Sequence, residues 1–434
     1  MNDNKQVKPA NGKLGVLCVG LGAVTSTFIT GVLMARKGLA QPVGSLTQLA
    51  SMRVGKGDQK QYKKINEIVS LSNLNDLVLG AWDIFPDTAY ESAIHAEVLK
   101  EKDINPVKEE LQAIKPMPAV FDHNFVKRLN GTHIKEDKGR WALMEELRTD
   151  IRNFKQANGC DRIVVIWAAS TEIYVPLNKE VHYSIEALEK AMKSNDKENI
   201  APSMCYAYAA IAEGCPFIMG APNLCVDTPA MWDFAEKHNV PISGKDFKTG
   251  QTMMKTVLAP ALKTRMLGLN GWFSTNILGN RDGEVLDDPA NFKTKEVSKL
   301  SVIETILDGE EYPNLYKNIF HKVRINYYPP RGDDKEGWDN LDIYGWMGYP
   351  MQIKVDFLCK DSILAAPLLL DLVLLSDLAS RAGKGGIQYW LSFYLKSPMH
   401  KLDEKPVHDL FEQFAMLKNA IREMGGYEAD QEID

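Results

Sequence analysis

Lysine side chains gather in the polar middle of the chain, at spacings that suit the binding of an anion. Lys295 and Lys299 lie four residues apart in a segment with a helical pattern, so their side chains share one face. Like charges at this spacing repel each other unless an anion or a carboxylate lies between them. A solvated helix face is the more common explanation of such a pair, and the pattern alone leaves both explanations open.

Other charged residues stand in short polar segments that we expect to form loops. The segments are residues 245–248 (KDFK), 280–283 (NRDG) and 331–335 (RGDDK). Each is also compatible with an ordinary surface turn. Lys396 follows an aromatic run, and a lysine beside buried aromatic rings is less often plain surface. Asp361 and Ser362 stand where an apolar strand gives way to a long helix, so Ser362 is a candidate N-cap.

A glycine turn near residue 20 is a candidate site for the phosphates of a nucleotide. Residues 14–19 predict a buried strand, Gly20 and Gly22 follow it, and residues 25–35 have a helical pattern. Glycines in such a turn let the backbone approach a pyrophosphate, whose charge the helix start favours. The residues that follow the glycines are Ala23, Val24 and Thr25. The third glycine of a dinucleotide fingerprint is missing, and residues 44–50 lack the acid expected to bind the ribose. The turn alone therefore leaves dinucleotide binding and an ordinary turn equally open.

Two further segments stand directly after predicted strands. Asp83 follows the apolar run 77–81 and would lie at the carboxyl end of a strand, where an open α/β sheet binds its ligands. Ala168, Ser170 and Thr171 follow the β-branched run 162–167, and small side chains there allow a cofactor to approach closely. A helix-capping role for Asp83 and simple turn chemistry for the second segment remain equally compatible with the sequence.

The elements around these residues predict an α/β fold with an inserted α+β part. A helix with apolar residues at helical spacing ends at Gly159 and leads into the buried strand 162–167, which is the pattern of a βαβ unit. We therefore expect a Rossmann-like, doubly wound parallel sheet in the N-terminal half. The pattern changes near residue 243. The elements expected beyond it are helices at 253–265 and 295–307, strands at 322–328 and 351–358, a polar glycine-rich segment at 270–288, and helices again from 362.

The overall composition argues against several classes of function. The chain has 434 residues, enough for two domains, and its net charge of -6 argues against a nucleic-acid surface. Residues 1–13 lack an apolar signal segment, and the apolar stretch 363–375 is too short to span a membrane and contains Pro367 and Asp371. Six cysteines without a CxxC pair favour a cytoplasmic protein. The eight histidines show no HxH or HExxH pattern, so the sequence leaves open whether the protein binds a metal ion.

In this order, the segments resemble the myo-inositol-1-phosphate synthase family from about residue 14 to residue 398. The most specific matches are residues 246–252 (DFKTGQT), 278–283 (LGNRDG), 295–299 (KEVSK), 360–367 (KDSILAAP) and 393–398 (FYLKSP). Five ordered motifs at compatible spacing are far more specific than one glycine turn.

The resemblance implies an isomerase, an inositol-3-phosphate synthase, that converts glucose 6-phosphate into 1D-myo-inositol 3-phosphate. Tightly bound NAD would oxidise C5, enolisation and an intramolecular aldol reaction would close the ring, and the ketone would then be reduced, so that no NADH is released. The resemblance also implies an NAD-binding domain formed by residues 1–245 and 360–434. Residues 246–359 would form a catalytic and oligomerisation domain of a homotetramer. Members of the family differ in using a monovalent or a divalent cation, so the cation is left open.

The resemblance further implies roles for individual residues. Lys295 and Lys335 would stabilise oxyanions at the enolate and aldol stages, and Lys396 would carry the proton of the C5 hydroxyl. The residues implied in catalysis are Lys295, Lys299, Lys335, Lys396, Asp246, Asp282 and Asp361. Those implied in substrate binding are Asn280, Lys295, Lys299, Lys335 and Lys396, with Lys299 and Asn280 at the phosphate. Those expected at the cofactor are Gly20, Gly22, Ala23, Val24, Thr25, Asp83, Ala168, Ser170, Thr171, Asp246 and Asp361.

Several features depart from the eukaryotic members of the family and favour a bacterial-type member. The phosphate loop at residues 20–27 is shorter, residues 203–208 differ, and Arg281 stands where those members usually carry asparagine. Two other functions remain to be weighed. One is an NAD-dependent sugar-phosphate dehydrogenase without cyclisation, and the other is a non-enzymatic NAD-binding scaffold, against which the spaced lysines count.

Overall fold

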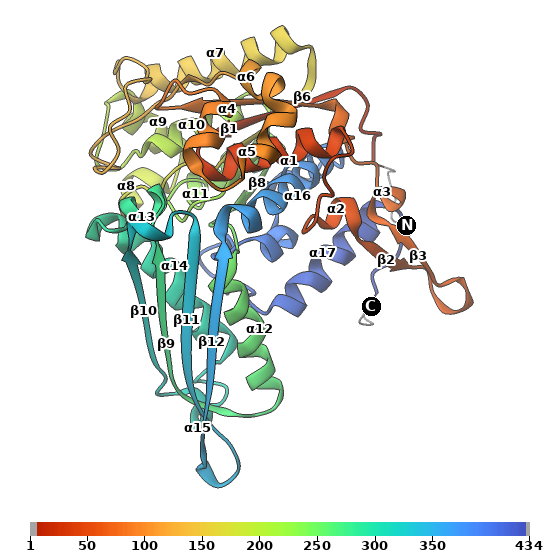
Figure 1. The fold of residues 1–434 in the computed structure, drawn as a ribbon, viewed down its shortest axis with the longest axis vertical. Coiled ribbons are helices and arrows are strands. Elements are labelled where there is room, and N and C mark those ends of the chain that lie inside the picture. Colours follow the sequence, from red (N-terminus) through yellow and green to blue (C-terminus); the bar gives the residue numbers. More distant parts are fainter. Residues whose placement is uncertain (1–6, 431–434) are drawn as a thin grey trace.

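A parallel sheet of seven strands forms the larger part of the protein (Figure 1). The computed structural model describes residues 7–430, apart from the side chains of residues 296–301. Along the sheet the strands are β13 (Gly386–Ile387), β8 (Pro241–Gly244), β7 (Phe217–Met219), β6 (Cys160–Trp167), β1 (Lys13–Val19), β4 (Leu77–Asp83) and β5 (Met117–Pro118). Neighbouring strands all pair in parallel, so the expected Rossmann-like, doubly wound sheet is confirmed.

Helices cover both faces of this sheet because the strands are apolar on both sides. Along β1, Leu14 and Val16 belong to one buried cluster, whereas Leu17 and Val19 belong to the other. The helices of the first cluster are α1 (Ala23–Arg36), α16 (Asp361–Arg381) and α17 (Leu410–Met424), and those of the second are α7 (Arg140–Asn158), α10 (Pro202–Ala212) and α11 (Pro229–Lys237). Continuous apolar runs such as β6 are what a strand buried on both faces requires.

Helix α16 is the long helix that the sequence predicts from residue 362. We expected Pro367 and Asp371 to break the apolar stretch, but both lie inside one helix of 21 residues. Its length and hydropathy would suffice to cross a membrane, yet 72% of its apolar window is buried inside the protein. Asp371 is accommodated there by the hydroxyls of Ser45 and Thr47. The helix therefore has the surroundings of a core helix.

A second, mixed sheet of four strands extends away from the first (Figure 1). Its order is β10 (Phe320–Tyr327), β9 (Gly268–Leu278), β11 (Asp334–Tyr344) and β12 (Pro350–Lys360). We expected loops or polar segments where β9 and the start of β11 lie, which was wrong. Buried and partly exposed positions alternate along both strands, so their polar residues hid them from the apolar pattern.

Helices α12 (Gly250–Thr264) and α14 (Pro289–Ile306) pack on one face of this second sheet. Their core joins Leu262 and Ile303 to Trp272 and Leu341 of the strands. Helix α14 begins six residues earlier than the expected start at residue 295, and a short helix, α13 (Arg281–Leu286), precedes it. The division of the chain at residues 246 and 359 stays a prediction.

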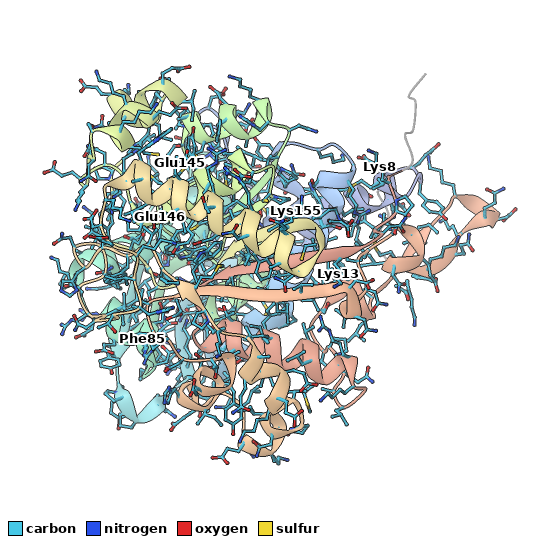
Figure 2. All side chains as sticks on the ribbon, turned by 90° about the horizontal axis from the view of Figure 1, so that it is seen from above. Lys8, Lys13, Phe85, Glu145, Glu146 and Lys155 are labelled. Carbon is cyan, nitrogen blue, oxygen red and sulfur yellow. The ribbon has the colours of Figure 1, made fainter. Side chains whose placement is uncertain are left out.

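The carboxyl ends of the parallel strands form one edge of the larger sheet. In Figure 2, Lys13 at the start of β1 lies on the right, whereas Phe85, two residues after β4, lies on the left. Parallel strands bring the segments that follow β1, β4 and β6 to this same edge. The glycine turn, Asp83 and Ala168 therefore share it.

Candidate active site

The turn between β1 and α1 has the geometry of a phosphate-binding turn. Gly20 has a φ of +92°, and a Cβ there would lie 2.8 Å from the Cα of Ala169. Gly22 is the N-cap of α1, and a Cβ on it would meet nothing within 4 Å, so the space beyond the helix start is open. Helix geometry leaves the amides of the first turn without intrahelical partners. These amides belong to Ala23, Val24 and Thr25. The amides at this helix start can therefore serve an anion, while the Thr25 side chain is buried.

Asp83 occupies the strand end at which a dinucleotide-binding fold carries its ribose acid. Its strand lies directly beside β1, and its carboxylate accepts the amides of Leu21 and Phe85. Burial raises the pKa of Asp83, and these two amides oppose that rise. Residues 44–50, at the usual spacing for this acid, contain none. A long insertion separates α1 from β4, so Asp83 comes 62 residues after Leu21.

The segment after β6 lies against the glycine turn. Ala168 N donates to Val19 O over 2.9 Å, and Ala169 packs against Gly20. Ala168 and Ser170 are half-buried, while Thr171 is buried. The structure thus brings the residues expected at the cofactor to one edge of the sheet. An open glycine cradle, a free helix start and an acid on the neighbouring strand fit a dinucleotide such as NAD.

Asp246 is the centre of a buried charge cluster beside this edge. Its exposed fraction is 2%, and its φ of +63° lies in the left-handed region, which is uncommon for a residue with a side chain. Its Oδ1 accepts from Lys295 Nζ at 2.9 Å and from Lys396 Nζ at 3.2 Å. The amide of Lys396 also donates to Asp246 O at 2.7 Å, so the backbone holds these two residues together.

The two lysines on Asp246 differ in their pKa values. Burial opposes the charge of Lys295, but Asp246 and Asp282 outweigh it and raise the pKa. At Lys396 burial prevails, helped by the charges of Lys295 and Lys335, and lowers the pKa to about 8 although Asp246 opposes this. Burial opposes ionisation of Asp246, yet the two ammonium groups keep the pKa of its carboxyl below the usual range. A neutral amine is therefore accessible at Lys396 near neutral pH.

Lys335 and Asp361 form a second centre. Lys335 is the second residue of β11 rather than part of a loop, and its Nζ donates to Asp361 Oδ2 at 3.1 Å. Burial opposes the charge of Lys335, but Asp361 and Asp282 raise its pKa. Burial likewise opposes ionisation of Asp361, while Lys335 and Lys396 hold its pKa well below the usual range. This pair is a fixed charge pair.

The remaining predicted residues surround these centres. Asp282 is half-buried at the start of α13, and its charge raises the pKa of both Lys295 and Lys335. Asn280 is the N-cap of the same helix; its Oδ1 accepts from Gly283 N at 3.1 Å, and its Nδ2 donates to Asp333 at 3.0 Å. The side chain of Lys299 lies outside the described residues, so its place at the phosphate stays a prediction.

Asp333 is a residue of the site that sequence reasoning missed. It is 3% exposed and accepts from Asn280 Nδ2 and from the Ser362 hydroxyl at 2.8 Å. Ser362 is therefore not the N-cap of α16, a position that Lys360 occupies. The only sequence signal was the pair of acids before Lys335, and nothing in the pattern distinguishes the buried acid from the exposed one.

The site combines fixed cations with one titratable amine. Asp246, Asp282 and Asp361 balance Lys295, Lys335 and Lys396 before the charge of Lys299 is counted. Within residues 7–430, no group of three or more His, Cys, Asp or Glu side chains is arranged to hold a metal ion. Such a site can stabilise oxyanions and move a proton next to a bound dinucleotide.

Comparison with known proteins identifies chains with the same organisation. The family model described as myo-inositol-1-phosphate synthase matches residues 14–422. "Inositol-3-phosphate synthase 1" of Bacteroides thetaiotaomicron is 69% identical over 423 residues, which are 97% of this chain and 98% of the relative. The inositol-3-phosphate synthase of Saccharomyces cerevisiae is 32% identical over 464 residues, covering 97% of this chain and 87% of the yeast protein.

Solved structures share the fold. The crystal structure of inositol-3-phosphate synthase from Caenorhabditis elegans superposes with a TM-score of 0.90 at 28% identity, covering 99% of this chain and 88% of the other. A myo-inositol-1-phosphate synthase-related protein from Thermotoga maritima matches with a TM-score of 0.74 at 22% identity, over 96% of this chain and all of the other. At that identity the second match shows the fold alone.

Proposed function

The chain belongs to the myo-inositol-1-phosphate synthase family, and from that premise we propose how its lysine–aspartate cluster performs the reaction. The activity is that of an inositol-3-phosphate synthase, an isomerase that converts glucose 6-phosphate into 1D-myo-inositol 3-phosphate with NAD. The observation that carries the proposed roles is the convergence of Lys295 and Lys396 on one carboxylate oxygen of Asp246.

Lys396 is the proton carrier in this proposal. Bound NAD supplies the oxidation at C5 and the later reduction of the same carbon. The neutral amine of Lys396 removes the proton of the C5 hydroxyl, and the resulting ammonium group returns it when the alcohol is restored. A pKa of about 8 supports this role, because both forms of the amine are then populated near neutral pH.

Lys295 and Lys335 remain charged throughout. The ketone at C5 acidifies the hydrogens on C6, and the phosphate dianion that C6 carries can take one of them, which puts negative charge on the C5 oxygen. Attack of C6 on the C1 aldehyde then moves this charge to the aldehyde oxygen, to which the phosphate can return the proton. Fixed ammonium groups in a water-poor site stabilise such charges without reorganising, and the raised pKa values of both lysines support this assignment.

The phosphate of the substrate is assigned to Lys299 and Asn280. Asn280 uses one N–H for Asp333 and its oxygen for Gly283, so a second N–H remains for a phosphate oxygen. Asp83, Gly20 and Gly22 are assigned to the cofactor on the geometry of their turn. Asp246 and Asp361 hold the lysines beside it.

The cation, the assembly and the location belong to the same proposal. Asp246 and Asp361 are the carboxylates best placed for a cation, but both are paired with ammonium groups, so we derive no step through a cation. Exposed Phe320, Trp346 and Tyr349 on the second sheet support self-association, for which the homotetramer is the proposed form. The six unpaired cysteines support a cytoplasmic location.

Incubation of the protein with glucose 6-phosphate and NAD tests the function. We expect inositol phosphate to form with no net gain of NADH, at a rate that does not need added NAD in stoichiometric amounts. Accumulation of NADH in step with substrate loss, without inositol phosphate, would instead identify a sugar-phosphate dehydrogenase. The mass of the assembly in solution checks the tetramer.

A further inference from the structure

The segment that follows β6 also forms a surface on which α14 rests. We call residues 171–174 the α14 seat. Four hydrogen bonds join α14 to this region: Asn291 Nδ2 to Thr171 O (2.8 Å), Asn291 Nδ2 to Phe125 O (3.0 Å), Thr294 Oγ1 to Glu172 O (3.1 Å) and Tyr174 N to Ala290 O (3.3 Å). Lys295 is the next residue after Thr294. The orientation of the first two turns of α14 therefore depends on the seat.

The carboxylate of Glu172 anchors the α14 seat to Ser203 and Asn223. Its exposed fraction is 2%, and it accepts from Ser203 N at 3.0 Å, from the Ser203 hydroxyl at 2.5 Å and from Asn223 Nδ2 at 3.1 Å. The amide of Glu172 in turn donates to Asn223 Oδ1 at 2.9 Å. Three donors converge on this side chain, and an ionised carboxylate is a group that accepts from all of them and donates to none.

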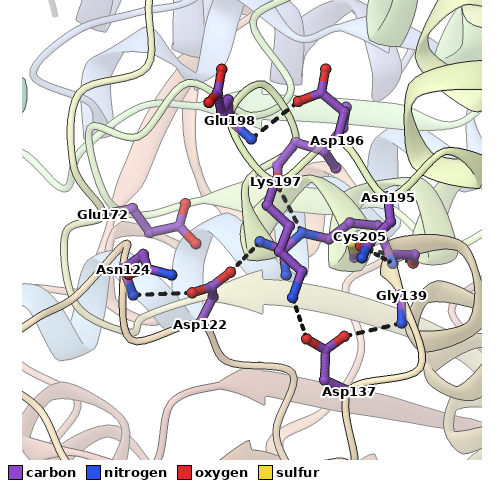
Figure 3. A network of polar contacts seen from close by, with 12 residues as sticks. Asp122, Asn124, Asp137, Gly139, Glu172, Asn195, Asp196, Lys197, Glu198 and Cys205 are labelled. Carbon is purple, nitrogen blue, oxygen red and sulfur yellow. Dashed lines mark hydrogen bonds and ion pairs between the residues drawn. The ribbon is translucent and has the colours of Figure 1, made fainter.

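The carboxyl group of Glu172 lies in a buried pocket near one ion pair. Burial raises its pKa to about 7, opposed by Ser203 and by the charge of Arg140 on α7. Arg140 is itself paired with Asp122 at 2.6 Å, and Figure 3 shows Glu172 beside this polar network. Burial raises the pKa of the nearby Cys205 thiol to about 12, so that group stays neutral. The three donors on this buried side chain point to a requirement for a carboxylate.

A role in the fold of α10 is the simplest explanation of Glu172. The N-cap of α10 is Ala201, which has no side-chain oxygen, and the bond from Ser203 N to Glu172 supplies the missing acceptor. That explanation accounts for the carboxylate but not for the bonds from the seat to α14. Glu172 joins the two sets of contacts, because its side chain binds α10 and its carbonyl receives Thr294.

We propose that Glu172 is a positioning residue for the reaction, which holds the α14 seat and thereby sets Lys295 against Asp246. The inference rests on the proposed function, because the role of Lys295 is assigned there. Failure of the unaltered chain to make inositol phosphate would refute that function. Normal synthesis by the unaltered chain together with an unaffected Glu172 variant would refute only the inference.

The first test compares Glu172→Gln with Glu186→Gln in the full-length holoenzyme. An amide at residue 172 brings N–H groups to a place where Ser203 and Asn223 already donate, so the seat shifts. We expect kcat to fall about 10-fold, with the dissociation constant of NAD changed by less than about 2-fold. Glu186 is exposed on α9 (Ile185–Lys193) and serves as the matched control, which should keep the unaltered kcat. A loss of NAD affinity in proportion to kcat would overturn the inference, because Glu172 would then act through the cofactor.

A second variant separates positioning from folding. Thr294→Val keeps the shape of the side chain, leaves the α10 pocket untouched and removes one bond to the seat. We expect kcat to fall about 3-fold with an unchanged melting temperature, and faster amide hydrogen exchange over residues 290–295. The double variant with Glu172→Gln should be no slower than Glu172→Gln alone, because both changes disturb the same contact between the α14 seat and α14. Multiplicative losses in the double variant would overturn the inference. Should Glu172→Gln fail to fold, an unchanged kcat in Thr294→Val would overturn it as well.

Discussion

The two carboxylates of the site, Asp246 and Asp361, differ in the number of lysine ammonium groups that they bind. Asp246 accepts two ammonium groups, from Lys295 and Lys396, whereas Asp361 accepts one, from Lys335. Asp246 and all three lysines are buried, and Asp361 is partly exposed, so burial acts on both centres. The difference lies in the ratio of positive to negative charge around each lysine.

The balance between burial and the neighbouring charges decides which lysine can lose its proton. Lys335 has a carboxylate to itself, and its pKa is raised; Lys396 shares one with Lys295, and burial lowers its pKa to about 8. The first lysine is therefore a permanent cation, while the second can act as a base and as an acid. One cluster provides both functions because the charge of Asp282 helps to raise the pKa of Lys295 and Lys335, whereas burial prevails at Lys396.

Loss of the titratable amine is expected to have the largest effect. In Lys396→Met, nothing removes the proton of the C5 hydroxyl, and kcat should fall about 10⁴-fold, the upper range for general acid–base catalysis. The rate of inositol phosphate formation measures this effect. Lys354→Met, on the exposed edge of β12, is the matched control and should retain normal activity. A kcat within about 10-fold of normal would remove Lys396 from proton transfer.

The pH dependence tests whether Asp246 sets the behaviour of Lys396. In the unaltered enzyme kcat/KM should rise as the pH increases through about 8, because only the neutral amine accepts a proton. The carboxylate of Asp246 raises this pKa, so Asp246→Asn should move the rise to lower pH by about 1 unit or more. A rise displaced to higher pH would show that another group titrates.

A substitution at the glycine turn should have a smaller effect, on the affinity for NAD. Asp83→Ala removes the acid assigned to the ribose and the acceptor for two amides, and should weaken NAD binding about 10-fold. Titration calorimetry with NAD measures the affinity, with the exposed Asp58→Ala as a control. Equal affinities in the two variants would assign the ribose to another residue.

The sequence predicts the larger sheet better than the smaller one for a physical reason. Strands such as β6 are buried on both faces, so their residues form a continuous apolar run that stands out. In β9 and β11, polar residues such as Asn276 and Asp339 occupy buried positions. Both of these side chains form a hydrogen bond with the side-chain amide of Gln251. Such strands have no apolar run, and the chain pattern indicated loops instead.

The site was predictable by motif but not by geometry. The segments carrying Asp246, Lys295 and Lys396 each stood out. The two lysines, however, lie 49 and 150 residues along the chain from Asp246, whose carboxylate they share. Local patterns carry no signal for such a contact. The same limit hid Asp333, which meets Asn280 and Ser362 only in the folded protein, and Glu172, whose proposed role depends on a helix far along the chain.

The central claim is that Lys396 and Lys335 act at different stages, and single turnover with glucose 6-phosphate tests it most directly. Lys335→Met keeps the pair of Asp246 and Lys396, so we predict that it oxidises C5 and accumulates the absorbance of reduced nicotinamide without forming inositol phosphate. Lys396→Met should show neither signal. The same outcome in both variants, with no reduced nicotinamide or with equal amounts, would contradict a division of the reaction between Lys396 and Lys335.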